Sequence, residues 1–467
     1  MQTMPSKATR IGIFTGLCWL YVCIHLDRQI LAILAESVKS DLRIGDAALG
    51  TLTGSAFSIV YALLGLNFGR VADAADRLKL VRVGAWVWSL ASVGAAFAPG
   101  YAPLIAARAG VAVGEAIATA AAVSLMADLA GDRYRARASS LFFACAFLGA
   151  GLAAILGGAS VSFFRDSTSI AGWRAALVLA GAPGIAGALY LSCYRWNDKP
   201  REPRQPAGRL TVTAVLVAVS LLSVVVQMKF PPNEGAPAAV LLAVAAGVYW
   251  AYRLYRDDAA SFRATLGQTT FRWLLLAFAA VLFVDFAASF WLIPFAQRRF
   301  GVSAAVAGAQ LGALIVAGGI AGCAAGGWIA DRWRLRNAAG RVWTALFAVL
   351  VETAAILIAI YQSSYDLFVI AFAAFCFASG GWTGVAAAIG MDIIPPAHRG
   401  TGVAAYFLVT TILGPGLGAW VAGVLGGMLG SMTASLAACC GVTLIAAGGF
   451  VKLGRAISGN AIMPRSE

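Results

Sequence analysis

The 467-residue chain is 60% hydrophobic and only 12% charged, yet it carries a formal net charge of +14. This composition excludes a single water-soluble core, because one core could not bury so many apolar residues, and lipid must cover many of them. The eight cysteines show no CxxC or zinc-like spacing and there are only two histidines, so we expect neither a disulfide framework nor a metal site.

Apolar runs long enough to cross a bilayer, about 20 residues each, follow one another along the chain. They predict fourteen transmembrane helices, near residues 11–35, 47–70, 80–98, 101–127, 138–163, 173–194, 210–228, 237–254, 273–296, 304–329, 341–361, 365–391, 401–426 and 431–452. The first run is too long for the core of a signal peptide, so we expect it to be a retained helix.

The basic residues indicate the orientation of these helices, because cytoplasmic loops carry an excess of Lys and Arg. With the N-terminus in the cytoplasm, most of the 35 Lys and Arg residues fall in cytoplasmic segments. An even number of helices then places both termini there, and the small loops suit a bacterial inner (plasma) membrane. The net charge reflects this bias and a surface that faces anionic lipid, so we expect the lipid bilayer, and no nucleic acid, as a partner.

The first predicted helix carries two charges at membrane depth, Asp27 and Arg28. Each intramembrane charge costs about 2.5–3.5 kcal/mol on insertion scales. The pair therefore needs partners or a polar cavity. Either it lines a water-accessible path for a substrate or ion, or it is a structural ion pair between helices.

Other predicted helices also carry charges. Arg108 and Glu115 are seven residues apart in the run 101–127 and so share one helix face. Counted from the ends of their helices, Asp27 and Arg108 lie at overlapping depths. Asp285 is a third mid-membrane acid, in the run 273–296, and Glu352 lies in the middle of the run 341–361 without an assigned role.

The chain contains an internal repeat. Three landmarks recur in the same order, separated by about 260 residues. They are residues 69–73 and 327–331, Asp128 with Arg135 and Asp392 with Arg399, and residues 148–152 and 413–417. We therefore expect two homologous six-helix halves in parallel orientation. The expected domains are a six-helix bundle over 1–200, a linker with an inserted transmembrane hairpin over 201–268, and a second bundle over 269–467.

Several segments carry a family resemblance. Gly69, Ala72, Asp73, Arg77 and Lys79 resemble the major facilitator loop signature G-x-L-A-D-R-x-G-R-R/K. Within that superfamily the chain resembles the spinster branch, which is related to lysolipid and sphingolipid transporters, in residues 26–28, 41–42, 49–57, 107–116, 172–174 and 181–184. The resemblance implies an all-α integral membrane protein with the major facilitator fold, two six-helix bundles plus a two-helix central insertion.

The resemblance also implies site residues. It places Asp27, Arg28, Arg108 and Glu115 in one polar cluster, and pseudo-symmetry turns Asp285 toward the same cavity. The arginines cannot deprotonate and suit an anionic headgroup or a carboxylate. The acids can couple proton movement to transport, because burial favours a neutral carboxyl and a nearby arginine favours a charged one. Tyr61, Trp291 and Trp382 are candidates for an apolar cavity wall, with packing as the alternative.

A cytoplasmic gate is the second expected site. Carboxylates at helix ends can meet the positive N-terminal end of a neighbouring helix and nearby arginines. The gate residues are Gly69, Asp73, Arg77, Asp128, Arg135, Arg137, Asp331, Arg332, Asp392 and Arg399. Glycine-rich runs over 149–158 and 414–423 allow close helix packing, and with it sliding of the two halves.

These features predict a transporter, not an enzyme, because the chain has no HExxH, no G-x-S-x-G and no P-loop. We expect a monomer that moves a small amphipathic, anionic or zwitterionic solute, such as a lysolipid or sphingoid phosphate, by alternating access. Protons are the expected coupling partner, with a proton gradient and no cofactor. A polyspecific drug/proton antiporter or an organic-anion/proton symporter is the alternative.

Overall fold

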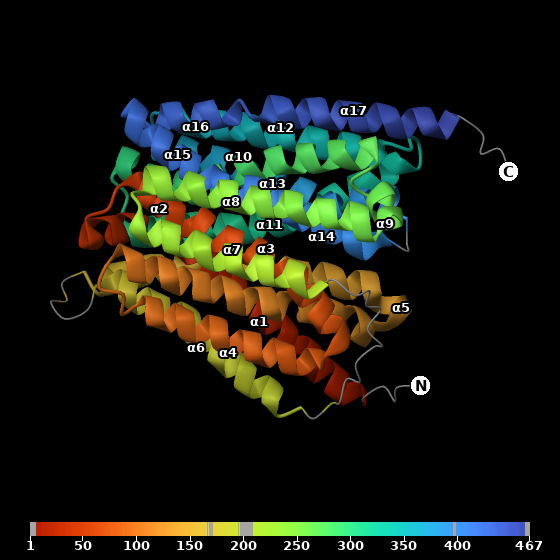
Figure 1. Cartoon of the computed structure of the whole chain (residues 1–467). Helices are drawn as coiled ribbons and strands as arrows, with labels where there is room; N and C mark the ends of the chain where they lie inside the picture. Colours follow the sequence, from red (N-terminus) through yellow and green to blue (C-terminus); the bar gives the residue numbers. More distant parts are fainter. Residues whose placement is uncertain are drawn as a thin grey trace. The chain divides into compact units, whose positions relative to one another are not determined.

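A computed structural model describes residues 6–165, 167, 171–194, 196, 209–395 and 398–462. Within these ranges the side chains of residues 69–70, 72–74, 127, 130–140, 209–210 and 460–462 are not described. The described chain is built of α-helices, with one short turn of 3₁₀ helix and no strand (Figure 1). This is the outcome expected for a membrane protein, since a helix satisfies its own backbone polar groups in lipid.

Seventeen helices are described (Figure 1). They are α1 (Lys7–Leu42), α2 (Asp46–Thr53), α3 (Ser55–Ala74), α4 (Arg77–Ala95), α5 (Tyr101–Phe163), α6 (Gly172–Ser192), α7 (Arg209–Lys229), α8 (Pro232–Asp257), α9 (Ala259–Ala264), α10 (Thr269–Phe300), α11 (Ala304–Arg334), α12 (Gly340–Ile360), α13 (Tyr365–Ile393), α14 (Arg399–Leu413), α15 (Pro415–Leu429), α16 (Met432–Cys440) and α17 (Thr443–Ile462).

Thirteen stretches of the described chain are long and apolar enough to cross a membrane. Thirteen of the fourteen predicted spans coincide with them. The span predicted over 80–98 forms α4, whose first two turns carry Arg77, Lys79 and Arg82. These charges shorten its apolar stretch. The spans predicted over 101–127 and 138–163 both lie within α5, which is helical throughout its 63 residues.

Two predicted spans are interrupted by a glycine. Gly54 ends α2 and precedes α3, with φ −92° and ψ −99°. Gly414 plays the same part between α14 and α15, where it precedes Pro415 at the start of the second helix. Proline is favoured at the first position of a helix because it has no N–H to leave unpaired there. Each interruption lies inside a candidate membrane span.

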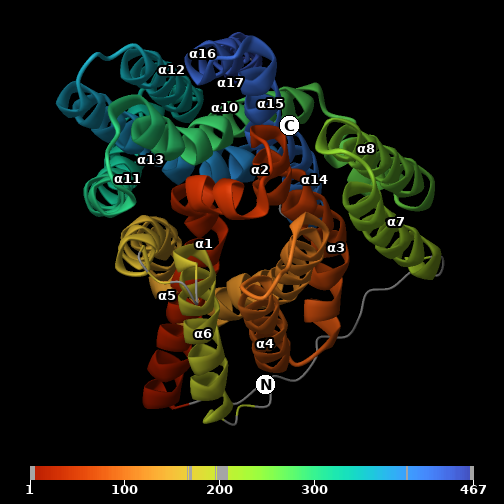
Figure 2. The ribbon, with the colours of Figure 1, turned by 90° about the vertical axis from the view of Figure 1, so that its left-hand side faces the viewer.

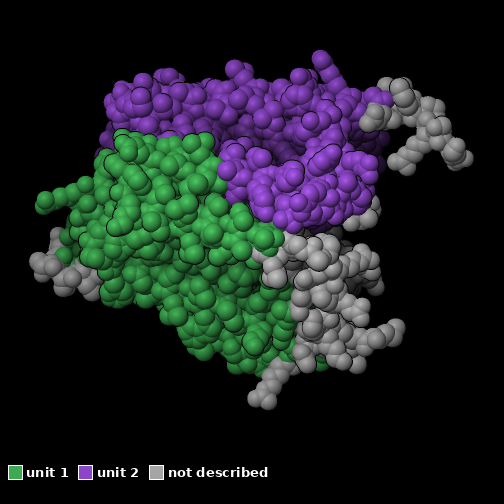
Figure 3. All heavy atoms as spheres, viewed as in Figure 1, with its two compact units in different colours: residues 1–243, 302–313 green, residues 244–301, 314–467 purple. Residues whose placement is uncertain are grey.

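The chain packs into two compact units (Figure 3). Unit 1 contains residues 1–243 and 302–313, and unit 2 contains residues 244–301 and 314–467. In unit 1, α1 packs against α5 and α6, and α4 packs against α5 and α6 (Figure 2). In unit 2, α10 packs against α13, α14, α15 and α17, and α12 packs against α13.

The first helix of the inserted hairpin belongs to unit 1 and has polar contacts inside it. Its first helix, α7, packs against α3 and α5. The Ser55 hydroxyl donates to Gln227 Oε1 at 2.7 Å, and the Thr213 hydroxyl donates to Asn67 Oδ1 at 3.1 Å. These two hydrogen bonds hold α7 against α3. A hydrogen bond between side chains in an apolar setting fixes orientation as well as proximity.

Glycines let helices approach closely inside each unit. A Cβ on Gly84 of α4 would meet the backbone of Gly114 and Ala118 on α5. In unit 2, a Cβ on Gly322 of α11 would overlap the Phe377 carbonyl on α13. The glycine-rich runs over 149–158 and 414–423 are also at close contacts, with α1 and α10 respectively. Small residues allow such approach between membrane helices.

Candidate functional site

Four charged side chains lie together inside unit 1. Asp27 and Arg28 come from the middle of α1, and Arg108 and Glu115 come from one face of α5. The apolar neighbours of these residues are the reason that the helices pack at this level, since Ile24, Leu26 and Ile30 of α1 are buried. The polar cluster is therefore set within an apolar core.

Asp27 is paired with Arg108. The Arg108 guanidinium donates from Nη1 to Asp27 Oδ2 at 2.8 Å. The Ser92 hydroxyl of α4 donates to the other carboxylate oxygen, Oδ1. Asp27 is fully buried and Arg108 is 2% exposed. This pair thus connects α1, α4 and α5, with both acid oxygens occupied.

Arg28 is paired with Glu115. Its Nε donates to Glu115 Oε2 at 2.5 Å. The two ends of this pair differ in access, because the Glu115 side chain is fully buried whereas the Arg28 side chain is 24% exposed. Arg28 is therefore the most exposed member of the cluster.

Two aromatic rings flank the arginines. The Arg28 guanidinium carbon lies 4.9 Å from the ring centroid of Phe57 and 4.5 Å from that of Tyr61. Arg108 lies 5.3 Å from the centroid of Phe57. The two rings are stacked on each other with centroids 5.5 Å apart. A guanidinium over an aromatic face gains cation–π attraction and an apolar setting for its charge.

The cluster has unused hydrogen-bonding capacity. Within the described residues, Arg28 Nη2, Arg108 Nε and Glu115 Oε1 are buried and have no partner. Buried polar atoms are normally satisfied, and an orphan in a native site calls for a ligand or a water. The formal charges of the two arginines and the two acids cancel. Arg28 Nη2 is nevertheless a hydrogen-bond donor without a partner among the described residues.

Unit 2 contains a second polar group. Asp285 of α10 accepts at 2.7 Å from the Ser379 hydroxyl, and Glu352 of α12 accepts at 2.7 Å from the indole N–H of Trp382. Both donors come from α13. Trp382 is thus a hydrogen-bond donor as well as an apolar side chain. Trp291, by contrast, is fully buried and donates to the Ala419 carbonyl at 2.8 Å, so it packs inside unit 2.

Two of the predicted gate residues, Asp128 and Asp392, form equivalent ion pairs in the two units. Arg77 at the start of α4 pairs with Asp128 at 2.7 Å, and Arg341 at the start of α12 pairs with Asp392 at 2.8 Å. The partners are 51 residues apart in both cases. Arg341 also pairs with Asp331 at 2.7 Å. The two halves of the internal repeat thus contain an equivalent ion pair.

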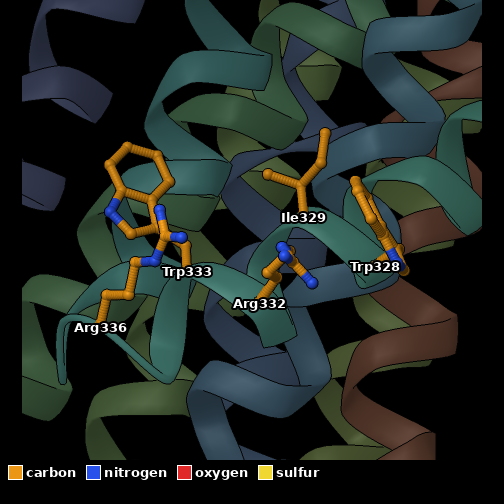
Figure 4. Close-up of a pocket in the computed structure, with 5 residues that line it drawn as sticks. All are labelled: Trp328, Ile329, Arg332, Trp333 and Arg336. Atoms are coloured by element: carbon orange, nitrogen blue, oxygen red, sulfur yellow. The ribbon is translucent and has the colours of Figure 1, made fainter.

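Other gate residues have a different placement. Arg332 lies over the Trp328 ring, with 5.9 Å between guanidinium carbon and centroid. Figure 4 shows both in an open surface pocket at the end of α11, with Ile329, Trp333 and Arg336. Arg399 donates to the Met391 carbonyl. The remaining gate residues, Gly69, Asp73, Arg135 and Arg137, are among those whose side chains the structure does not describe.

A third polar contact joins segments that carry the family resemblance. Asp41 at the end of α1 accepts from the Trp173 indole at 2.9 Å and from Arg174 at 3.1 Å. Arg174 also donates to the carbonyls of Ala96 and Ala98, which follow α4. The ends of α1, α4 and α6 are therefore held together.

Sequence analysis missed several of these partners. Ser92 and Phe57 carry no charge, so nothing in their helices' patterns distinguishes them from packing residues. Arg341 was not among the expected gate residues, and Glu352 had no assigned role. The repeat could have indicated Arg341, because its distance from Asp392 equals that of Arg77 from Asp128.

The helical fold and the thirteen candidate membrane spans define a polytopic membrane protein, and charged groups are buried inside both of its units. Residues 17–339 match the Major Facilitator Superfamily, and the chain belongs to this superfamily. It is thus a multi-pass membrane protein that transports, rather than an enzyme, and it is spinster-like in its similarities.

Proteins similar to this chain include efflux pumps and spinster proteins. The chain is 28% identical to an MFS-type efflux pump of Mycolicibacterium smegmatis over 86% of this chain and 81% of that protein. It is also 28% identical to Protein spinster of Drosophila melanogaster, over 40% of this chain and 31% of that protein. The fold resembles the crystal structure of a bacterial homolog to the human lysosomal transporter Spinster, with TM-score 0.75, 22% identity and coverage of 99% of this chain and 100% of that one.

Proposed function

We propose that the chain moves an amphipathic anionic or zwitterionic solute, such as a lysolipid or sphingoid phosphate, by proton-coupled alternating access. The observation that carries this proposal is the environment of Arg28. Its side chain is partly exposed, its buried Nη2 has no partner among the described residues, and its guanidinium lies over the rings of Phe57 and Tyr61. A phosphate or carboxylate can bind the guanidinium through charge-assisted hydrogen bonds. The aromatic rings offer apolar contact to the rest of an amphipathic molecule.

Glu115 is the proposed coupling residue. It is fully buried and depends on Arg28 for its only charged hydrogen bond in the described structure. A solute anion that takes over the Arg28 guanidinium would leave Glu115 without that bond. Protonation would then restore neutrality, since an unpaired buried carboxylate is costly. Solute binding and proton binding are linked by competition for one arginine.

An efflux pump for drugs is the second candidate. The similarity to an MFS-type efflux pump over most of the chain favours it. The charge of the cluster favours the anionic solute instead, because its one partly exposed charged group is an arginine. A bacterial inner membrane location, cytoplasmic termini and a monomeric state complete the proposal.

Transport by purified protein in liposomes with an imposed pH gradient tests the proposal. The solutes are lysophospholipids, sphingoid phosphates, organic acids and cationic dyes. We expect wild type to move an anionic or zwitterionic amphiphile and Arg28→Ala to bind it about ten- to hundredfold more weakly, the value of a charged hydrogen bond. Glu115→Gln should keep solute exchange and lose the response to the gradient.

Tyr61 supplies a matched pair of variants for the same assay. Tyr61→Phe keeps the ring under Arg28, whereas Tyr61→Ala removes it. Only the second should weaken binding. Movement of cationic dyes alone, with Arg28→Ala fully active, would overturn the anionic solute and favour the drug antiporter.

A further inference from the structure

Two buried acids of unit 2 lie beside each other without a basic partner. Asp285 is 8% exposed and Glu352 is 2% exposed. Each acid accepts from a side chain of α13, and these two donors are one helical turn apart, so both carboxyl groups face the same part of α13. In the described part of the chain neither acid forms a salt bridge. The acids of unit 1 differ in this respect, because Asp27 and Glu115 each have an arginine.

The donors to this pair come from one face of α13. Ser379 donates to Asp285 Oδ1, and Trp382, three residues further on, donates to Glu352 Oε2. The other oxygen of Glu352, Oε1, is buried and has no donor among the described residues. The pair therefore has one unfilled hydrogen-bond position, on the acid that is more deeply buried.

Among the described residues, no basic side chain pairs with either acid. The titratable groups next to it are the thiols of Cys376 from α13 and Cys440 from α16. From α14, Tyr406 packs against Phe278 of α10. Helix α15 carries no titratable residue, and Lys452 of α17 lies over the Trp273 ring. Arg341, at the start of α12, is paired with Asp331 and Asp392.

Two carboxylate charges in such a place repel each other. The repulsion is strong where the effective dielectric constant is low, and no basic side chain among the described residues pairs with either acid. One proton removes the repulsion and also turns one carboxyl group into a donor. That donor can fill the empty position at Oε1, as in other carboxyl pairs that share a proton.

We propose that Asp285 and Glu352 form a carboxyl–carboxylate pair that binds one proton, a second proton site that belongs to unit 2. The inference rests on the proposed proton-coupled function and extends it from the arginine-linked acid of unit 1. Ser379 and Trp382 hold the two carboxyl groups toward each other, and the site needs no arginine. Its ligand is the proton itself.

Infrared difference spectroscopy of the full chain in lipid, without any solute, tests the site. A step from alkaline to neutral pH should produce the C=O band of a protonated carboxyl. Glu352→Gln should lose this band, because the amide N–H supplies the donor that the proton supplies in wild type. Asp285→Asn and the double variant should lose it as well, so the result does not depend on one variant folding.

Two controls make the result specific. Asp366→Asn, in the first turn of α13, should keep the band, and so should Glu115→Gln. A band that survives in all three unit 2 variants, or one that only Glu115→Gln removes, would overturn the inference. A band that sodium ions suppress would also overturn it, in favour of a cation site. Because no solute is present, failure here leaves the anionic solute untouched, and failure of solute transport leaves the band untouched.

Discussion

At the scale of single residues, the two acids of the cluster in unit 1 pair with arginines that differ in exposure. Arg108 is buried, and its pair with Asp27 receives a further bond from Ser92. Arg28 is partly exposed and has a free nitrogen. The first pair is thus suited to hold helices together, and the second is suited to exchange partners. Under the proposed function, the first pair is a structural lock and the second lies on the path of the solute.

Loss of Arg108 should destabilise the protein strongly. Arg108→Gln leaves Asp27 buried without its cation, and breaking a buried pair in this way costs about 3–5 kcal/mol. Equilibrium unfolding in mixed micelles, followed by tryptophan fluorescence, measures the loss. The double variant Asp27→Asn/Arg108→Gln should recover much of it, because it leaves no unpaired charge.

The exposed Lys79 provides the comparison for that measurement. Lys79→Gln should change the free energy of unfolding by less than about 0.5 kcal/mol, as surface substitutions usually do. If Arg108→Gln were no more harmful than Lys79→Gln, the pair would not be a structural lock.

At the scale of helices, the sequence was sufficient to locate the membrane spans but not to predict which side chains pair between them. Apolar length alone located thirteen of the membrane-spanning stretches that the structure describes. It could not tell that Arg108 pairs with Asp27 rather than with Glu115 on its own face, because spacing along one helix does not give the register of another. It also missed the interruptions at Gly54 and Gly414, since each lies inside an unbroken apolar run.

Close packing of α11 on α13 should depend on Gly322. A Cβ there would overlap the Phe377 carbonyl, which is backbone and cannot swing aside. Gly322→Ala should therefore cost about 1–3 kcal/mol, the usual penalty for overpacking. The same unfolding assay checks it.

Gly327 of the same helix is the control for Gly322. A Cβ on Gly327 meets nothing within 4 Å, so Gly327→Ala should be neutral or slightly stabilising through helix propensity. Equal effects of the two substitutions would show that propensity, and not the approach of two backbones, decides the outcome.

At the scale of the whole molecule, the internal repeat includes an Arg–Asp ion pair in each unit, and we expect these pairs to matter for the movement of the two halves. Each unit holds an arginine at the start of one helix against an aspartate 51 residues later. Alternating access requires each half to move as one body, and these pairs tie helix ends within their own unit. The repeat could be found in the sequence from Asp128 and Asp392, and Arg77 and Arg341 stand at equivalent positions in it. Only the contacts show that each arginine pairs with its aspartate.

The two arginines should therefore behave alike when they are removed. Arg77→Gln and Arg341→Gln should each slow transport by about tenfold, which corresponds to about 1.4 kcal/mol in the barrier, while the affinity for solute stays unchanged. Initial rates in liposomes and equilibrium binding to the same samples separate these two quantities. Arg334→Gln is the matched control, because Asp392 keeps Arg341 when Arg334 is lost. A fall in affinity instead of rate, or a large effect of Arg334→Gln, would contradict a role of the repeated pair in movement.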